Sequence, residues 1–106
     1  MSDFLEKIKK LLKGKDVRIS EHGYDELAED KLFISEIMNG INKAKVVEEY
    51  PHYPKGYCIL VLQQDNEGKP VHVLWGIPKN YQKPAVLITA YRPDPDLWDK
   101  TFLNRI

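Results

Sequence analysis

The spacing of apolar residues changes once along this chain, and that change constrains its fold more than any single motif. Up to Lys43, apolar residues recur at helical spacing, and beyond it they alternate with a period of two in four short runs. Helices followed by consecutive strands with short links are typical of an α+β domain. We therefore predict one domain over residues 1–106, with N-terminal helices packed on a four-stranded antiparallel meander sheet.

Start and stop signals place the three predicted helices. The first is an amphipathic helix within residues 1–14, and we expect its apolar stripe to dock on the domain rather than on a membrane or RNA. Ser20 is the predicted N-cap of a second helix over 21–29. A third helix starts near Ile34, with Ser35 as its candidate cap.

The second part of the sequence predicts four strands and a short closing helix. The strands are expected at 46–50, 57–64, 71–77 and 85–91. Residues 16–19 are interpreted as an extended connector, and Asp96 as the cap of a short C-terminal helix through Trp98 and Phe102. Alternation in the third strand assigns Val71, Val73 and Trp75 to the core face and His72 to the opposite one, facing solvent or a cleft.

Composition narrows the classes of function. Sixteen basic and sixteen acidic residues give a formal net charge of zero, which lowers the expectation of nucleic-acid binding because that affinity comes largely from phosphate neutralisation. The single cysteine, Cys58, is predicted to be a buried free thiol. Three histidines without shared spacing predict no metal site, and nothing in the sequence indicates a cofactor. No apolar run is long enough to span a membrane, so we predict a cytoplasmic protein.

His22 is the first candidate for catalysis. It falls in the first turn of the predicted second helix, where a neutral imidazole can act as a general base. Glu26 lies four residues further on the same helical face and can orient the ring. A histidine that only positions the helix fits the same pattern, and the two interpretations are equally supported.

The end of the last strand supplies the other candidates. Tyr91 and Arg92 leave the sheet there, and a guanidinium can bind a phosphate or a carboxylate with two hydrogen bonds. Asp94 and Asp96 are close enough in sequence to neutralise Arg92 in a local ion pair instead. Arg105 is a second cation that a returning C-terminus can bring to the same rim.

Several loose motifs occur together in a fixed order. They are Ser20-Glu21-His22, Ile34-Ser35, Val47-Glu48-Glu49-Tyr50-Pro51, Gly68-Lys69-Pro70-Val71-His72-Val73, and Thr89-Ala90-Tyr91-Arg92-Pro93-Asp94 with Trp98. Together they resemble the bacterial and archaeal domain-of-unknown-function family 4258, over residues 18–105. That family is itself similar to the RelE/ParE-like toxin fold, whose better-known members are metal-independent endoribonucleases paired with antitoxins.

The resemblance implies an RNA-cleaving toxin with His22, His72, Tyr91 and Arg92 as its polar cluster. Glu26 and Arg105 would then contact the substrate. The chain departs from the family pattern in this helix, because Glu26 and Asp30 stand where the resemblance predicts arginines. The loss of these cations weakens the expectation of phosphate binding. The alternative is a non-catalytic module that binds a protein partner, such as an antitoxin, through the same scaffold.

Overall fold

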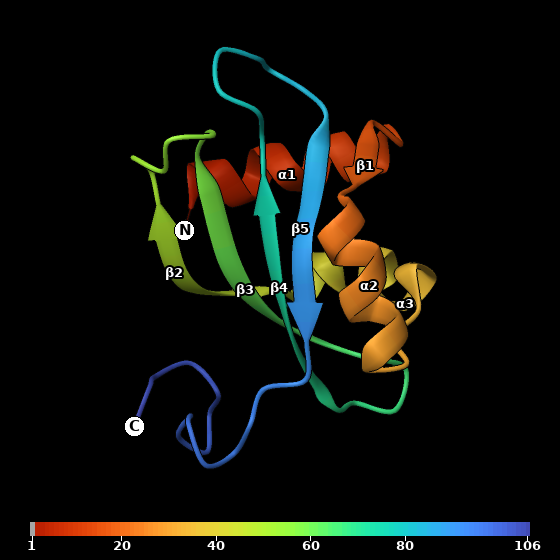
Figure 1. Cartoon of the computed structure of the whole chain (residues 1–106), viewed down its shortest axis with the longest axis vertical. Helices are drawn as coiled ribbons and strands as arrows, with labels where there is room; N and C mark the ends of the chain where they lie inside the picture. The colour runs from red at the N-terminus through yellow and green to blue at the C-terminus, as the bar shows by residue number, and fades with distance from the viewer. Residues whose placement is uncertain (1) are drawn as a thin grey trace.

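The computed structural model describes residues 2–106 and contains a sheet of five strands (Figure 1). Their order across the sheet is β1-β5-β4-β3-β2. The strands are β1 (Val17–Ile19), β2 (Lys45–Tyr50), β3 (Cys58–Gln64), β4 (Pro70–Gly76) and β5 (Ala85–Tyr91). The last four form the predicted antiparallel meander, with boundaries within one residue of expectation.

The sheet differs from the prediction by its fifth strand. Residues Val17–Ile19, predicted to be a connector, pair in parallel with Ala85–Leu87 and form an edge of the sheet. Three residues are too few to show an alternating pattern, and their hydrogen-bond partner lies at the far end of the chain. The sheet is therefore mixed, and β1 leads the chain from the sheet directly into the second helix.

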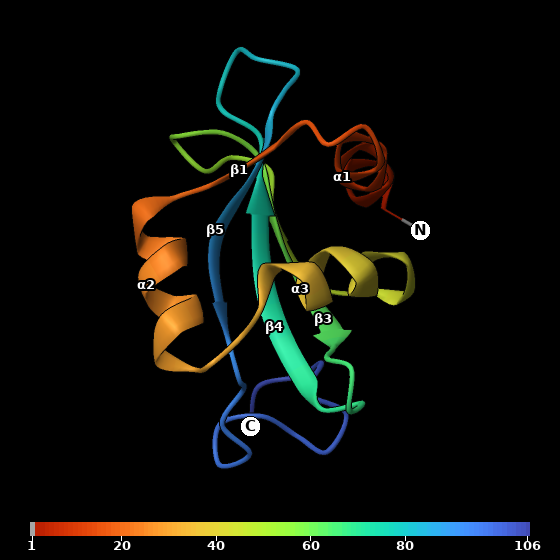
Figure 2. The same cartoon turned by 90° about the vertical axis from the view of Figure 1, so that its right-hand side faces the viewer.

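The helices lie on both sides of the sheet. In Figure 2, α1 (Asp3–Lys13) and α3 (Ile34–Gly40) cover one face, and α2 (Glu21–Glu29) lies beside β5 on the other side. α3 continues into a short 3₁₀ turn, Ile41–Lys43. Ser2 caps α1, and Ser20 caps α2 as predicted, whereas the predicted cap Ser35 lies inside α3, which starts without a side-chain cap. None of the described helices has the length and apolar character that a membrane crossing requires.

The core lies between the sheet and the face covered by α1 and α3. Val71, Val73 and Trp75 are buried on that face of β4, as alternation predicts, and they belong to one core cluster with apolar residues of α1 such as Ile8. Trp75 donates a hydrogen bond from Nε1 to Gln63, whose amide nitrogen donates to the Ile37 carbonyl. The only polar pair in this part of the described core therefore ties α3 to the sheet.

The C-terminal segment, residues 93–106, forms turns and not the predicted helix. Trp98 and Arg105 form an isolated antiparallel bridge, and Asp99 accepts hydrogen bonds from Thr101 and Asn104. These local bonds satisfy the backbone without a helix. Trp98 is buried, so the segment packs back on the sheet at the lower end of Figure 1.

Candidate functional site

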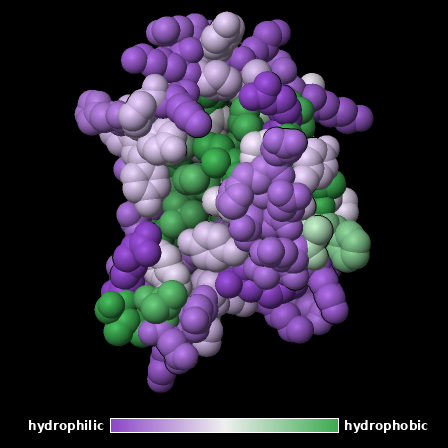
Figure 3. All heavy atoms as spheres, viewed as in Figure 1, coloured by the Kyte–Doolittle hydropathy of each residue, from purple (hydrophilic) through white to green (hydrophobic). Residues whose placement is uncertain are grey.

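The sheet face that α1 and α3 leave uncovered is apolar at its centre. Figure 3 shows this face, with hydrophobic side chains between polar groups over α2 and at both ends. Leu74 and Ile88 are half-buried there, while Leu60 and Cys58 lie deeper. Burial raises the pKa of the Cys58 thiol, as expected for the predicted structural cysteine. Two hollows open on this face, and they share Tyr53 and Ile88.

The first hollow, of about 390 Å³, is basic. Its walls carry Arg18, His22, Tyr53 and Lys55, and its floor includes Ile88; no aspartate or glutamate lines it. We call it the basic hollow. Arg18 comes from β1 and Lys55 from the loop between β2 and β3. Among residues 2–106 neither cation forms an ion pair, so both charges remain available to an anionic ligand.

The start of α2 is fixed so that His22 lies at the rim of this hollow. The Ser20 hydroxyl donates to the Ile88 carbonyl and accepts from the Gly23 amide, which ties the first turn to β5. Gly23 permits this approach, because a Cβ at that position would lie 2.8 Å from the Leu87 carbonyl oxygen. The His22 side chain is 65% exposed, and its Nε2 lies 3.5 Å from Glu26 Oε1, as the helical spacing predicts.

The second hollow, of about 270 Å³, lies nearer the C-terminal segment. Leu60, Leu74 and Ile88 line it, with Tyr91 and Arg105 at its edge. We call it the tyrosine hollow. Arg105 lies 4.6 Å above the Trp98 ring and donates to Glu48, 2.9 Å away. The guanidinium that was expected to contact substrate is therefore engaged by the fold.

His72 does not face solvent or a cleft. It is fully buried beneath the C-terminal segment, where its ring packs edge-on against Trp98 with centroids 4.5 Å apart. Nε2 lies 2.7 Å from the Phe102 carbonyl oxygen, so it donates that bond, and Nδ1 then accepts from the Tyr91 hydroxyl at 3.1 Å. Both ring nitrogens thus hold the C-terminal segment and Tyr91 in place.

Arg92 follows Tyr91 directly after the end of β5, but its contacts differ from those of Tyr91. Its guanidinium lies 3.0 Å from Asp65 in the turn between β3 and β4, and its backbone amide donates to Asp30. Burial alone would raise the pKa of Asp65, but hydrogen bonds from the amides of Lys69 and Glu67 and from Arg92 lower it overall. The ion pair that the sequence suggested for Arg92 exists, but its partner is Asp65 and not Asp94 or Asp96.

The six predicted site residues are therefore divided among three places. His22 lines the basic hollow and contacts Glu26, which does not line it, and His72, Tyr91 and Arg105 form one contact group at the C-terminal segment. Arg92 lines neither hollow of the open face. Sequence reasoning missed Arg18 and Lys55, because a residue in an assumed connector and one in a turn gave no signal before their positions were known.

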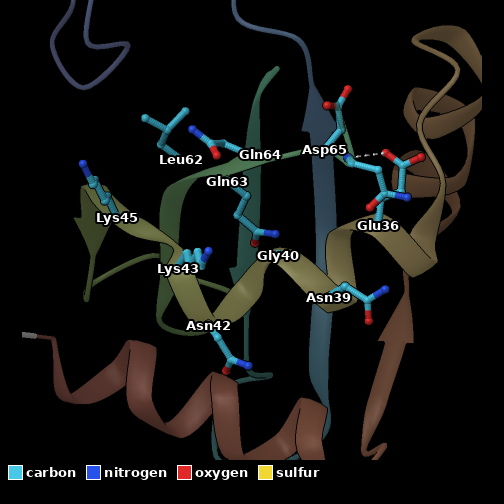
Figure 4. Close-up of a pocket in the computed structure, with 11 residues that line it drawn as sticks. Glu36, Asn39, Gly40, Asn42, Lys43, Lys45, Leu62, Gln63, Gln64 and Asp65 are labelled. Carbon is cyan, nitrogen blue, oxygen red and sulfur yellow. Dashed lines mark hydrogen bonds between the residues drawn. The ribbon is translucent and has the colours of Figure 1, made fainter. Parts of the chain in front are cut away.

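A third hollow lies away from the open face, between α3 and the end of β3 (Figure 4). It measures about 510 Å³ and is polar, with Asn39, Asn42, Lys43 and Lys45 among its walls. Glu36 also lines it and accepts a hydrogen bond from the Asn66 amide. Cations and carboxylates are mixed here, unlike in the basic hollow. No group of three potential metal ligands occurs anywhere within residues 2–106.

Comparison with protein families agrees with the motifs that run through these elements. Residues 19–92 match the model of DUF4258, a domain of unknown function, from the end of β1 to the end of β5. The chain belongs to the DUF4258 family. No curated protein and no solved structure matches it. The family description assigns no activity, and the DUF4258 match includes His22, His72, Tyr91 and Arg92 but ends before Arg105.

Burial of His72 makes stability depend on pH. Burial lowers the pKa of the imidazole below its ordinary 6.5, and the hydrogen bond to Phe102 opposes this only in part. The unfolded chain therefore binds a proton near pH 6.5 that the folded chain does not, so stability is complete above this pH and falls below it. We expect the free energy of unfolding, measured in urea, to decrease from pH 7.5 to 5.5.

Replacing His72 with glutamine should flatten that dependence. Carboxylates whose pKa is lowered in the folded state, such as Glu49 and Asp65, also stabilise the fold. They lose this stabilising contribution only at more acidic pH, so they do not affect the change between pH 7.5 and 5.5. An equal pH slope in wild type and His72→Gln would show that another group titrates.

Proposed function

We propose that this domain binds single-stranded RNA at the basic hollow and cleaves it slowly, without a metal, using His22 as the general base. The observation that carries the proposal is the segregation of charge: a chain of zero net charge places Arg18, Lys55 and His22 around one hollow that no carboxylate lines. Such a local basic surface supplies the phosphate contacts that the overall composition lacks.

An aromatic ring stands beside these cations. Tyr53 is 49% exposed and lines the basic hollow, so a base can stack on it while Arg18 and Lys55 hold the adjoining phosphate. Trp75, by contrast, is fully buried and is not a stacking surface. The RNA would lie along the open face at the end formed by the loops before β3 and after β4.

Cleavage follows from the position of His22. The imidazole takes the proton of a ribose 2′-hydroxyl, the 2′-oxygen forms a bond to phosphorus, and the bond to the 5′-oxygen breaks, with that oxygen protonated by water. Glu26 Oε1 lies 3.5 Å from Nε2 and orients the ring. We expect a low rate, because Arg92 and His72 are held elsewhere and only Arg18 and Lys55 remain to stabilise the developing charge.

The test measures binding and cleavage of a fluorescently labelled single-stranded RNA. Charge-assisted contacts are worth about 1.5–3 kcal/mol each, so Arg18→Gln with Lys55→Gln should weaken binding by at least about 100-fold. The salt dependence of the affinity should fall by about 1.4 in slope, since two phosphate contacts are lost. Lys43→Gln with Lys45→Gln removes the same charge from the polar hollow of Figure 4 and should leave binding unchanged.

His22→Ala should keep RNA affinity within a few-fold but lower the cleavage rate by about 10²–10⁴-fold. An RNA with deoxyribose at the cleaved position should bind and remain intact. Cleavage by His22→Ala at the wild-type rate would reject the assigned base, and equal binding by both double variants would reject the RNA surface. In cells, growth arrest that His22→Ala abolishes would extend the proposal to a toxin.

The tyrosine hollow favours a second function, the binding of a protein partner such as an antitoxin. Leu74 and Ile88 are half-buried and uncovered, and such apolar area on an open sheet face suits an apolar segment of another chain. If the domain neither binds nor cleaves RNA, Ile88→Glu provides the test. It should abolish binding of a purified partner while Lys43→Gln with Lys45→Gln does not.

A further inference from the structure

A fourth hollow lies next to the basic hollow and shares some of its lining residues. It measures about 420 Å³ and lies at the end of the molecule, between the loop before β3 and the loop after β4. We call it the end hollow. Both hollows are lined by Tyr53, Gly56 and Tyr57, so a ligand in one lies next to a ligand in the other.

Four aromatic side chains line the end hollow: Phe4, Tyr53, Tyr57 and Tyr81. Phe4 and Tyr57 stack nearly parallel at its base, with centroids 4.1 Å apart. The Tyr57 hydroxyl donates to Glu49, which holds that ring in place. Tyr81 also lines the hollow and is 69% exposed, the most exposed aromatic ring among the described residues. A large ring left in water beside a fixed aromatic base is suited to stack on a planar ligand.

The charged groups of the end hollow are all basic. Lys7, from α1, and Lys79, from the loop after β4, line it together with His52, and no carboxylate does. Lys7 donates a hydrogen bond to the Gln82 side chain, and among residues 2–106 neither lysine forms an ion pair. The planar ligand that fits this hollow therefore carries a negative charge, as a nucleotide does.

We propose that the end hollow is a nucleobase subsite, in which Tyr81 stacks on the base next to the phosphate held by Arg18 and Lys55. This inference rests on the proposed RNA binding and specifies it further: the minimal ligand spans two nucleotides, one on each side of the Tyr53–Tyr57 wall. Lys7 and Lys79 contact the phosphate of the outer nucleotide. Stacking requires only a ring, so the subsite accepts any base.

The test uses a labelled RNA hexamer, 2′-O-methylated so that it is not cleaved, and a matched set in which one nucleotide at a time is abasic. Stacking on an aromatic side chain is worth about 1–3 kcal/mol per base, so Tyr81→Leu should weaken binding of the intact hexamer by about 5- to 150-fold. Tyr81→Phe keeps the ring and should bind like the wild type. Tyr81 lines the end hollow and not the basic one, so the variant leaves Arg18 and Lys55 in place.

The abasic series identifies the base that stacks on Tyr81. At one position of the hexamer, loss of the base should weaken wild-type binding as much as Tyr81→Leu does, and the two changes together should cost no more than either alone. Additive losses at every position, or equal affinities of Tyr81→Leu and Tyr81→Phe, would overturn the subsite. If Tyr81→Leu has no effect while Arg18→Gln with Lys55→Gln does, the subsite fails and the RNA surface stands; if neither has an effect, both fail.

Discussion

Replacement of Trp75 by alanine is expected to lower the free energy of unfolding by about 3–5 kcal/mol, the cost typical of removing a large buried ring. Trp75 is fully buried at the centre of the sheet, and its Nε1 bonds to Gln63 at 3.1 Å. Alanine would leave a cavity there and would leave Gln63 Oε1 without its donor. Because small domains are stable by only about 5–15 kcal/mol, this is a large share of the total.

Two further variants separate the causes of that loss. Trp75→Phe fills most of the volume but lacks the N–H group, so it should cost about 1–3 kcal/mol for the unpaired Gln63 oxygen. Tyr24→Ala removes a ring that is 61% exposed and should change stability by less than about 0.5 kcal/mol. Urea denaturation monitored by circular dichroism gives all three values. A loss below about 1 kcal/mol for Trp75→Ala would mean that the sheet repacks around the vacancy.

Gly56→Ala is expected to cost about 3 kcal/mol or more and to abolish RNA binding. Gly56 has a φ of +134°, a conformation that L residues adopt only at a cost of about 1–3 kcal/mol. A Cβ there would also clash with the Ile77 carbonyl oxygen and lie 2.7 Å from the Lys79 amide nitrogen. Because these are backbone atoms, the clash can be removed only if the loop before β3 separates from the loop after β4. Tyr53 and Lys55 would move with the first of these loops.

Gly68→Ala is the matched control. Gly68 also has a positive φ, +80°, but a Cβ there would meet nothing within 4 Å. The free energy of unfolding of Gly68→Ala should therefore fall by only about 1 kcal/mol, the cost of the backbone conformation alone, and the variant should bind RNA normally. The difference in stability between the two variants measures the close approach of the loops. Equal losses for Gly56→Ala and Gly68→Ala would contradict the contact with Ile77.

Local patterns predicted most of the elements. Ser20 and the helical spacing after it define α2, and alternation in β4 separates buried Val73 and Trp75 from His72, because capping and period depend only on neighbouring residues. Two parts of the structure were not predicted correctly. β1 is too short to carry a pattern, and the segment after Pro93 has a capping residue in Asp96 but forms turns around Asp99 instead.

The candidate site was less predictable than the fold. His22 and Glu26 could be paired from the sequence because four residues make one helical turn, and the structure brings them together. The sequence also placed His72 on the non-core face of β4, but it gave no sign that the C-terminal segment covers that position. Arg18 and Lys55 gave no signal at all, because Arg18 lies in β1, outside the meander, and Lys55 lies in a turn far along the chain.

The sequence by itself determined the α+β class, the three helices, the four meander strands and the side of β4 that forms the core, since each follows from spacing within a few residues. Only the tertiary structure decided that His72 is buried and doubly hydrogen-bonded, that Arg92 pairs with Asp65, and that Arg18 and Lys55 line the same hollow. The residues of each pair are between 19 and 37 positions apart in the sequence. Their formation depends on how the strands are ordered in the sheet, which periodicity does not encode.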